Sequence, residues 1–311
     1  MSIYNNAPIY KAKRRRNPAK YIIFSVIFFL FVAILITFPS ETKRETKPFF
    51  QGLETPLVIA HRGGSTYPEN TLPAFEHSAQ IGADILEFDI HMTKDGHLVA
   101  IHDKTVDRTT DGQGTVDSFT LSELKLLDAG YSFIDQEGLF PFRNQGITIP
   151  TVTEIFEQFP NSYMNIEIKA QYPDIEQKLW ELIQDFNMEN KVLIASFNQK
   201  TIEQFNLVSG GKVAISGGKT EVTKFVLFHK FFLGILYRPK VDVIQIPTEQ
   251  SIFNLVDRKL IRGANKLNMQ LHYWTVNEPE EMEKLLLQGA DGIITDKPEV
   301  LIELIEQLGL K

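Results

Sequence analysis

The stretch LVIAHRGGSTYPENTLPAFEHSA, residues 57–79, contains a complete strand–turn–helix unit. Its first residues form an apolar run that favours a buried strand, and this run ends in His61 and Arg62. Two glycines follow, which let the backbone turn sharply without side-chain obstruction. An Asn-Thr pair then precedes apolar residues at helical spacing, as a helix cap does. We therefore expect one β–α unit that presents His61 and Arg62 at the strand's carboxyl end.

The same alternation continues through the rest of the chain. Short β-rich runs are separated mostly by helical patterns, over about 240 residues. This alternation predicts an α/β fold, and the repeat number favours a (β/α)8 TIM-type barrel, with a doubly wound sheet as the alternative. The nine predicted strands are 57–62, 85–91, 98–103, 163–169, 191–197, 212–216, 241–247, 271–276 and 292–295.

Nine strands are one too many for eight barrel positions. The four residues 94–97 contain Asp-Gly and are too short for a crossover helix, so we expect 85–91 and 98–103 to pair as an antiparallel hairpin. That pairing would set Asp89 opposite His102. The turn-rich stretch 104–150 is predicted to be a small inserted subdomain of the barrel domain, 56–311.

Charge is distributed unevenly along the 311 residues. Residues 1–47 hold nine Lys/Arg and two Asp/Glu, which leaves 23 against 37, a net −14, for the remainder. An acidic domain is a poor partner for nucleic acid, because binding to phosphates needs a basic face. The chain has no cysteine, so disulfides and thiolate metal sites are excluded.

Residues 21–38 carry no charge and would rise about 27 Å as a helix, close to the thickness of a bilayer core. Six basic residues lie in 11–20, which by the positive-inside rule keeps the N-terminus cytoplasmic and places the rest outside the cytoplasm. We therefore predict a basic cytoplasmic tail (1–20), a single-pass anchor in the cell membrane (21–38) and a polar tether (39–55). A cleaved signal peptide and a buried core helix are the competing interpretations.

Carboxylates alternate with apolar residues on two strands. Glu87 and Asp89 are two residues apart and project to one face, and Glu167 and Lys169 repeat this spacing. One such pair would be explained by solvated acids at a strand edge. Three carboxylates converging in one barrel mouth would repel each other without a cation, and oxygen ligands favour Ca²⁺ or Mg²⁺.

Two histidines and two cations complete the predicted site. His61 and His102 end different strands, and across a metal they could act as general acid and general base; either one alone would be explained as a structural histidine. Arg62 offers a planar fork for phosphate oxygens and Lys169 a point charge. This combination suits an anionic tetrahedral group better than a carbonyl.

Four motifs occur in an order that resembles the glycerophosphodiester phosphodiesterase family. They are HRGGSTYPENT, ILEFDIHMTKDGHLVAIHD, NIEIK and YWTVN followed by GADGIITDKP, and together they span about 57–300. The resemblance implies a (β/α)8 barrel with a small insertion after the His-Asp motif. It also implies hydrolysis of glycerophosphodiesters to glycerol 3-phosphate and an alcohol, with lysophospholipids as further possible substrates.

Carried over by motif, the resemblance implies a role for each site residue. His61 and His102 would be the catalytic pair, and the metal ligands would be Glu87, Asp89 and Glu167. Substrate would contact Arg62, Lys169 and Trp274. Two rival functions remain open at this point: a related phospholipase of the lysophospholipase D type, and a non-catalytic surface module that binds phosphates.

Residues 220–240 do not fit the common pattern. They are unusually aromatic and interspersed with Lys and Arg. A barrel helix buried against its neighbours explains them, and so does an interfacial helix that touches the bilayer.

Overall fold

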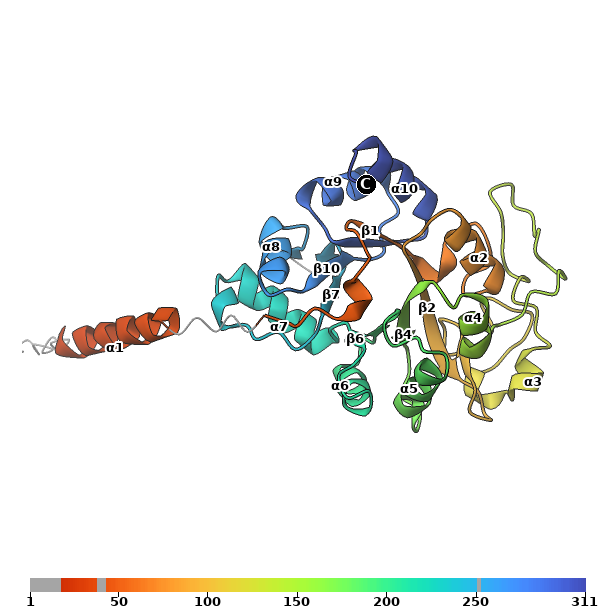
Figure 1. The fold of residues 1–311 in the computed structure, drawn as a ribbon, viewed down its shortest axis with the longest axis horizontal. Coiled ribbons are helices and arrows are strands. Elements are labelled where there is room, and N and C mark those ends of the chain that lie inside the picture. The colour runs from red at the N-terminus through yellow and green to blue at the C-terminus, as the bar shows by residue number, and fades with distance from the viewer. Residues whose placement is uncertain (1–17, 38–42, 251–252) are drawn as a thin grey trace, which may run out of the picture. The chain divides into compact units, whose positions relative to one another are not determined.

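The computed structural model describes residues 18–37, 43–250 and 253–311, and the chain divides into two compact units, 1–40 and 41–311. Most of the predicted basic tail (1–20) lies outside the described residues. The larger unit is built around a nearly closed barrel of parallel strands (Figure 1). These strands are β1 (Leu57–Ala60), β2 (Ile85–Met92), β4 (Tyr163–Ile168), β5 (Val192–Ala195), β6 (Ala214–Ile215), β7 (Val243–Ile246), β10 (Gln270–Tyr273) and β11 (Gly292–Thr295).

Strand order follows the chain around the barrel. From β1 to β6 and from β7 to β11, each of these strands pairs in parallel with the next one along the chain, and β1 pairs with β11. A parallel bridge between Ser216 and Val243 joins the end of β6 to β7. A doubly wound sheet would reverse its strand order at one point, and this sheet does not, so the barrel prediction holds.

Helices follow the strands and cover the barrel, as Figure 1 shows. They are α2 (Leu72–Gln80), α4 (Val152–Gln158), α5 (Ile175–Asp185), α6 (Gln199–Val208), α7 (Lys219–Lys230), α8 (Arg258–Lys266), α9 (Pro279–Gln288) and α10 (Pro298–Gln307). Smaller elements are α3 (Leu121–Leu124), the 3-10 turns η1 (Pro48–Phe50), η2 (His61–Gly63), η3 (Val116–Ser118) and η4 (Gly234–Leu236), and the short strands β3 (Leu98–Ala100), β8 (Glu249–Gln250) and β9 (Phe253–Asn254).

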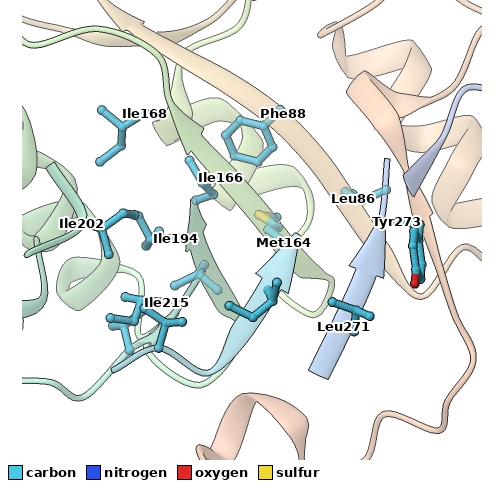
Figure 2. Packing of buried hydrophobic residues seen from close by; sticks show 14 of the residues in the cluster. Leu86, Phe88, Met164, Ile166, Ile168, Ile194, Ile202, Ile215, Leu271 and Tyr273 are labelled. Atoms are coloured by element: carbon cyan, nitrogen blue, oxygen red, sulfur yellow. The ribbon is translucent and has the colours of Figure 1, made fainter. Parts of the chain in front are cut away.

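Side-chain alternation separates the apolar core from the polar interior of the barrel mouth. Even-numbered residues of β2 and β4 pack outward against the helices, in a cluster that Figure 2 shows with Phe88, Ile166 and Ile202 of α6. The odd-numbered Glu87 and Glu167 therefore project to the opposite face. Burial of the even positions fixes the register, because a one-residue slip would turn the carboxylates into the core.

The hairpin between β2 and β3 forms as predicted, but its register differs by one residue. Ile90 pairs with Ala100, so Asp89 lies opposite Ile101 and not His102. The turn contains three residues rather than four, since the Thr93 N–H donates to the His97 carbonyl at 2.9 Å. Gly96 takes a φ of 87°, the left-handed conformation that a three-residue hairpin turn needs.

The stretch 104–150 lies between β3 and α4 and holds only η3 and α3 as helical elements among the described residues. It has a small apolar cluster of its own, which it shares with β3 and which contains Val99, Val106, Val116 and Leu124. This cluster lets an irregular segment hold a defined shape beside the barrel.

Of the tether predicted over 39–55, the structure describes residues 43–55, and part of these packs against the barrel. Arg44 forms an ion pair with Asp242 at 2.7 Å. Phe49 is fully buried among residues at or next to the first positions of the strands, including Leu57, Leu193 and Val243. The aromatic ring closes the amino end of the barrel. Sequence reasoning missed it because Phe49 stands in a polar context.

The smaller unit contains α1 (Pro18–Thr37). Within the described part of the chain, no helix combines the length and the apolar character needed to cross a membrane. The anchor predicted over 21–38 stays a prediction.

Residues 220–240 divide between the two interpretations. Most of the segment is α7, whose Phe225 and Val226 are buried in the core, as expected of a barrel helix. The following residues Phe231, Phe232 and Leu233 are 62%, 77% and 47% exposed.

Candidate active site

The predicted site residues gather at the carboxyl end of the barrel. A cavity of about 580 Å³ opens there, within the usual range for small-molecule sites. Its lining includes seven of the eight predicted residues: His61, Arg62, Glu87, His102, Glu167, Lys169 and Trp274. The eighth, Asp89, is buried beside them with 1% of its surface exposed. Carboxyl ends of barrel strands are where this fold carries its active sites.

The turn after β1 positions two of these residues. Arg62 has a φ of 53°, a left-handed conformation that is uncommon for a residue with a side chain. Its backbone N–H donates to the Glu87 carboxylate at 2.8 Å. A Cβ at Gly63 would lie 2.8 Å from the Ala74 Cβ, so only glycine allows α2 to pack this closely. The strained turn directs His61 and Arg62 toward the cavity.

His61 is held by a carboxylate that sequence reasoning did not assign. Its Nδ1 lies 2.6 Å from the Asp296 carboxylate, which in turn accepts a hydrogen bond from the Asn277 amide at 2.6 Å. Burial lowers the His61 pKa, but the hydrogen bond to Asp296 and the charge of Glu87 outweigh it, so the pKa lies above its ordinary value. Nδ1 is engaged by Asp296, which leaves Nε2 for chemistry.

His102 is also held by a carboxylate at its Nδ1 atom. Its Nδ1 lies 2.6 Å from Asp103, which accepts a hydrogen bond from Arg108 at 2.7 Å. Arg108 also donates two bonds of 2.7 Å to Glu69, and Glu69 contacts Arg62 at 3.1 Å. Burial, together with nearby Lys and Arg side chains, lowers the His102 pKa despite the hydrogen bond to Asp103. A continuous network therefore orients the imidazole.

The three predicted metal ligands form one acidic cluster. Each of Glu87, Asp89 and Glu167 offers an oxygen, and these oxygens all lie within 4.8 Å of one another. Burial and the neighbouring charge of Asp89 raise the pKa of Glu87 to about 8. Burial likewise raises the pKa of Glu167. The cluster resists carrying three negative charges by itself.

Two cations offset part of this charge. Lys169 Nζ lies 3.1 Å from Asp89 and 2.9 Å from Glu167, and Arg62 Nε lies 3.3 Å from Asp89. Burial raises the Asp89 pKa, but Lys169 and Arg62 outweigh it and hold that pKa below its usual range. Asn70 adds a 3.2 Å hydrogen bond to the same carboxylate.

The donor set fits a hard divalent cation. All three acidic ligands supply oxygen, and the buried side-chain oxygen of the adjacent Asn165 has no hydrogen-bond partner. A divalent ion would relieve the repulsion that raises the Glu87 pKa, so the residues present suit Ca²⁺ or Mg²⁺.

One wall of the cavity is apolar. Trp274 packs edge-on against Phe197, with ring centroids 5.5 Å apart, and Lys169 Nζ lies 5.8 Å from the Phe197 centroid. Val222, Val226, Leu227 and Leu255 continue this wall. The cavity therefore has both charged and apolar lining residues.

Sequence reasoning missed the residues that hold the site: Glu69, Asn70, Asp103, Arg108 and Asp296. A signal was present for three groups of them. Asp103 directly follows His102, Glu69 and Asn70 belong to the PENT motif, and Asp296 belongs to the ITDKP motif. The role of Arg108 had no local signal, because it depends on where the 104–150 segment folds.

Comparison with known proteins adds independent evidence. A Glycerophosphodiester phosphodiesterase from Caldanaerobacter subterraneus subsp. tengcongensis is 39% identical over 259 residues, which cover 81% of this chain and 99% of the relative. Lysophospholipase D from Homo sapiens is 28% identical over 291 residues, covering 85% and 90%. An Oleispira antarctica phosphodiesterase solved in complex with the product sn-glycerol-3-phosphate is 25% identical with a TM-score of 0.62, covering 81% and 97%.

The family assignment follows from a match over most of the chain. The model of the Glycerophosphoryl diester phosphodiesterase family matches residues 61–300, which include every site residue described above. The acidic cluster, the two carboxylate-held histidines and every barrel strand listed above except β1 lie inside that range. The chain belongs to the Glycerophosphoryl diester phosphodiesterase family.

Proposed function

We propose that this enzyme hydrolyses glycerophosphodiesters to glycerol 3-phosphate and an alcohol. The observation that carries this proposal is the pairing of two histidines in one cavity, each held through Nδ1 by its own carboxylate at 2.6 Å. Between them lie an acidic cluster that suits a divalent cation and two basic side chains. A phosphodiester needs this combination, since its charge must be neutralised while one proton leaves and another arrives.

Substrate binding falls to the charged end of the cavity. Arg62 and Lys169 hold the phosphate oxygens, and Trp274 lines the glycerol side. Glu87, Asp89 and Glu167 hold the cation, which when bound supplies Lewis-acid stabilisation of the phosphate charge. Because Lys169 and Arg62 also contact Asp89, phosphate and cation are kept side by side.

Proton transfer falls to the histidines. One of His61 and His102 accepts a proton from the attacking water, whose oxygen bonds to phosphorus, while the other protonates the alkoxide that leaves as its bond to phosphorus breaks. The two histidines together neither gain nor lose a proton. Asp296 and Asp103 fix Nδ1 of each ring and leave Nε2 to face the cavity. A non-catalytic phosphate-binding module would need the cations but would have no use for two held histidines.

A second substrate class is favoured by the apolar wall. Val222, Val226 and Leu227 of α7 line the cavity together with Leu255, and they come from other elements than the carboxylates of β2 and β4. Such a wall suits the acyl chain of a lysophospholipid, and a human relative is a Lysophospholipase D. We propose that lysophospholipids are hydrolysed at the same site as soluble diesters.

Location at the cell membrane is a proposal that the sequence alone supports. Residues 21–38 are free of charge and follow six basic residues, which favours a cytoplasmic N-terminus and an extracytoplasmic barrel. A reporter fused after Lys311 should be active only outside the cytoplasm. Activity of that reporter inside the cytoplasm would reverse the topology.

The test of the activity uses purified residues 41–311 and glycerophosphocholine. Phosphorus NMR should show the diester signal replaced by that of glycerol 3-phosphate. Excess chelator should stop the reaction, and Ca²⁺ or Mg²⁺ should restore it. Full turnover in excess chelator, or release of a different phosphate product, would contradict the proposal.

A further inference from the structure

A protruding apolar surface lies at the end of α7. Phe231 and Phe232 are 62% and 77% exposed, and Leu233 beside them is 47% exposed. These side chains are not needed for packing the helix, because Phe225 and Val226 already bury its core-facing side. Phe232 takes a φ of 61°, an unusual conformation for a bulky residue. The chain thus keeps two adjacent phenylalanines in water.

A basic helix face adjoins this apolar surface. The exposed residues of α8 include Arg258, Lys259, Arg262 and Lys266, and its sequence RKLIRGANK contains no acidic residue. Asp257, which caps α8, is paired with Lys230 at 2.7 Å. This concentration of positive charge stands out in a region that carries a net −14 over residues 48–311.

Direct contacts join the two surfaces into one. Lys259 Nζ lies 4.2 Å from the centre of the Phe232 ring, a cation–π contact. Lys230, the last residue of α7, also donates a 2.7 Å hydrogen bond to the Asn254 carbonyl just before α8. We call residues 231–233 together with the exposed basic residues of α8 the α7–α8 surface.

The α7–α8 surface adjoins the cavity. Leu227 lies one helical turn before Phe231, is 39% exposed and also lines the cavity wall. Leu255 lines the cavity three residues before α8 begins. A layer of lipid that touched Phe231 and Phe232 would therefore meet the apolar side of the cavity mouth.

We propose that the α7–α8 surface docks on an anionic lipid layer. Projecting aromatic side chains insert at the level of the headgroups, and Lys and Arg beside them attract anionic lipid; a surface that binds membranes reversibly combines both. Charge complementarity selects this partner, since the basic face contrasts with the acidic remainder of the barrel. This inference goes beyond the proposed function, because it concerns binding of the protein to a lipid surface and not hydrolysis in the cavity.

The test uses residues 41–311, which form one compact unit. The relative from Caldanaerobacter subterraneus subsp. tengcongensis aligns over 259 residues, which are 99% of its own length. A barrel domain of this size therefore forms a whole protein in that relative. The probe is cosedimentation with vesicles of phosphatidylcholine, with and without phosphatidylglycerol. We expect binding that needs phosphatidylglycerol and weakens as salt is raised. Absence of binding to either vesicle, or equal binding to both, would overturn the proposal.

Paired variants distinguish binding through this surface from non-specific binding through exposed apolar residues. Phe231→Ser with Phe232→Ser should lower the partition coefficient on anionic vesicles at least tenfold. The matched control is Leu126→Ser with Leu207→Ser, whose side chains are 83% and 73% exposed elsewhere on the barrel. The control should bind like wild type. An equal loss in both pairs would overturn the assignment of the surface.

A charge series tests the basic face. Replacing Arg258, Lys259 and Arg262 by Gln should weaken binding to anionic vesicles at least tenfold. Replacing the exposed Lys94, Lys200 and Lys284 by Gln is the matched control and should have a much smaller effect. All variants should keep wild-type turnover of glycerophosphocholine, which shows that they are folded. A basic-face variant that binds like wild type would overturn the proposal.

Discussion

A group of three carboxylates at the amino end of the barrel and a group of three at its carboxyl end act differently. At the amino end, Asp84, Asp242 and Asp291 each precede a strand, and each accepts a backbone N–H of the neighbouring strand at 2.7–3.0 Å. At the carboxyl end, Glu87, Asp89 and Glu167 face one another within 4.8 Å. The same chemical group closes the sheet at one end and forms a site at the other.

The difference lies in what surrounds each carboxylate. At the amino end the acids are spread around the barrel, and Phe49 fills the space between the strand starts. At the carboxyl end the acids converge, the backbone of Arg62 is strained and the pKa of Glu87 is raised to about 8. Local unfavourable energy is concentrated where ligands bind, and the stable amino end compensates for it. Variants at the two ends should therefore affect different measurements.

The largest effect is expected from the histidines at the carboxyl end. His61→Ala and His102→Ala should each lower kcat by about 10²–10⁴-fold, the usual loss on removal of a general acid or base. Thermal unfolding should be nearly unchanged, since neither ring belongs to the apolar core. Near-normal kcat in either variant would make that histidine structural.

The amino end should respond in the opposite way. Phe49→Ala removes a fully buried ring that closes the barrel, and it should lower the free energy of unfolding by about 3–5 kcal/mol. Urea unfolding measures this loss. Below the transition, kcat on glycerophosphocholine should match wild type, because Phe49 does not line the cavity. A lower kcat with unchanged stability would remove the distinction between the two ends.

Asp291 gives the amino end a pH dependence. Burial raises the pKa of Asp291 to about 6, so the protonated carboxyl is favoured in the folded state. The stabilisation of the fold by this proton is complete below about pH 4 and is lost as the pH rises through 6. Asp291→Asn cannot ionise and still accepts the Leu271 N–H. The stability of this variant relative to wild type should rise by about 2–3 kcal/mol from pH 4 to 7. A difference that is flat with pH would contradict the burial argument.

A smaller effect is expected at Asp242. Asp242→Ala leaves the buried Ile215 N–H without its acceptor and also removes the ion pair with Arg44, at a cost of about 1–3 kcal/mol in unfolding free energy. Asp242→Asn keeps an oxygen for that N–H and should cost less. Equal losses in the two variants would show that charge, and not the backbone hydrogen bond, matters at this position.

Much of the fold could be predicted because burial leaves a clear pattern. All nine predicted strands form, since alternating or continuous apolar runs bounded by turn residues mark them. The predicted hairpin register was wrong by one residue. The register depends on the left-handed conformation of Gly96, and the presence of an Asp-Gly pair does not by itself determine the length of the turn. Phe49 was missed because nothing in a local sequence window shows that an aromatic ring closes a distant barrel end.

The site was predictable to the extent that its residues lie at strand ends. The structure brings the eight predicted residues around one cavity, and their catalytic and ligand roles stay predictions. The supporting shell was not predictable in full, because Asp296 reaches His61 across 235 positions and Arg108 reaches Glu69 across 39. Such contacts depend on tertiary structure and leave no periodic signal.

The central claim is that the carboxyl-end carboxylates are arranged for a cation and not for stability. Urea unfolding of wild type and Glu87→Gln, each with and without Ca²⁺ or Mg²⁺, tests it most directly. Without cation, Glu87→Gln should be at least as stable as wild type, because burial and the charge of Asp89 disfavour the ionised Glu87 carboxylate in the fold and Gln cannot ionise. Cation at about 100 times its Kd should stabilise wild type by about 2.7 kcal/mol and the variant much less. A variant that is less stable without cation, and that gains as much from cation as wild type does, would contradict the account.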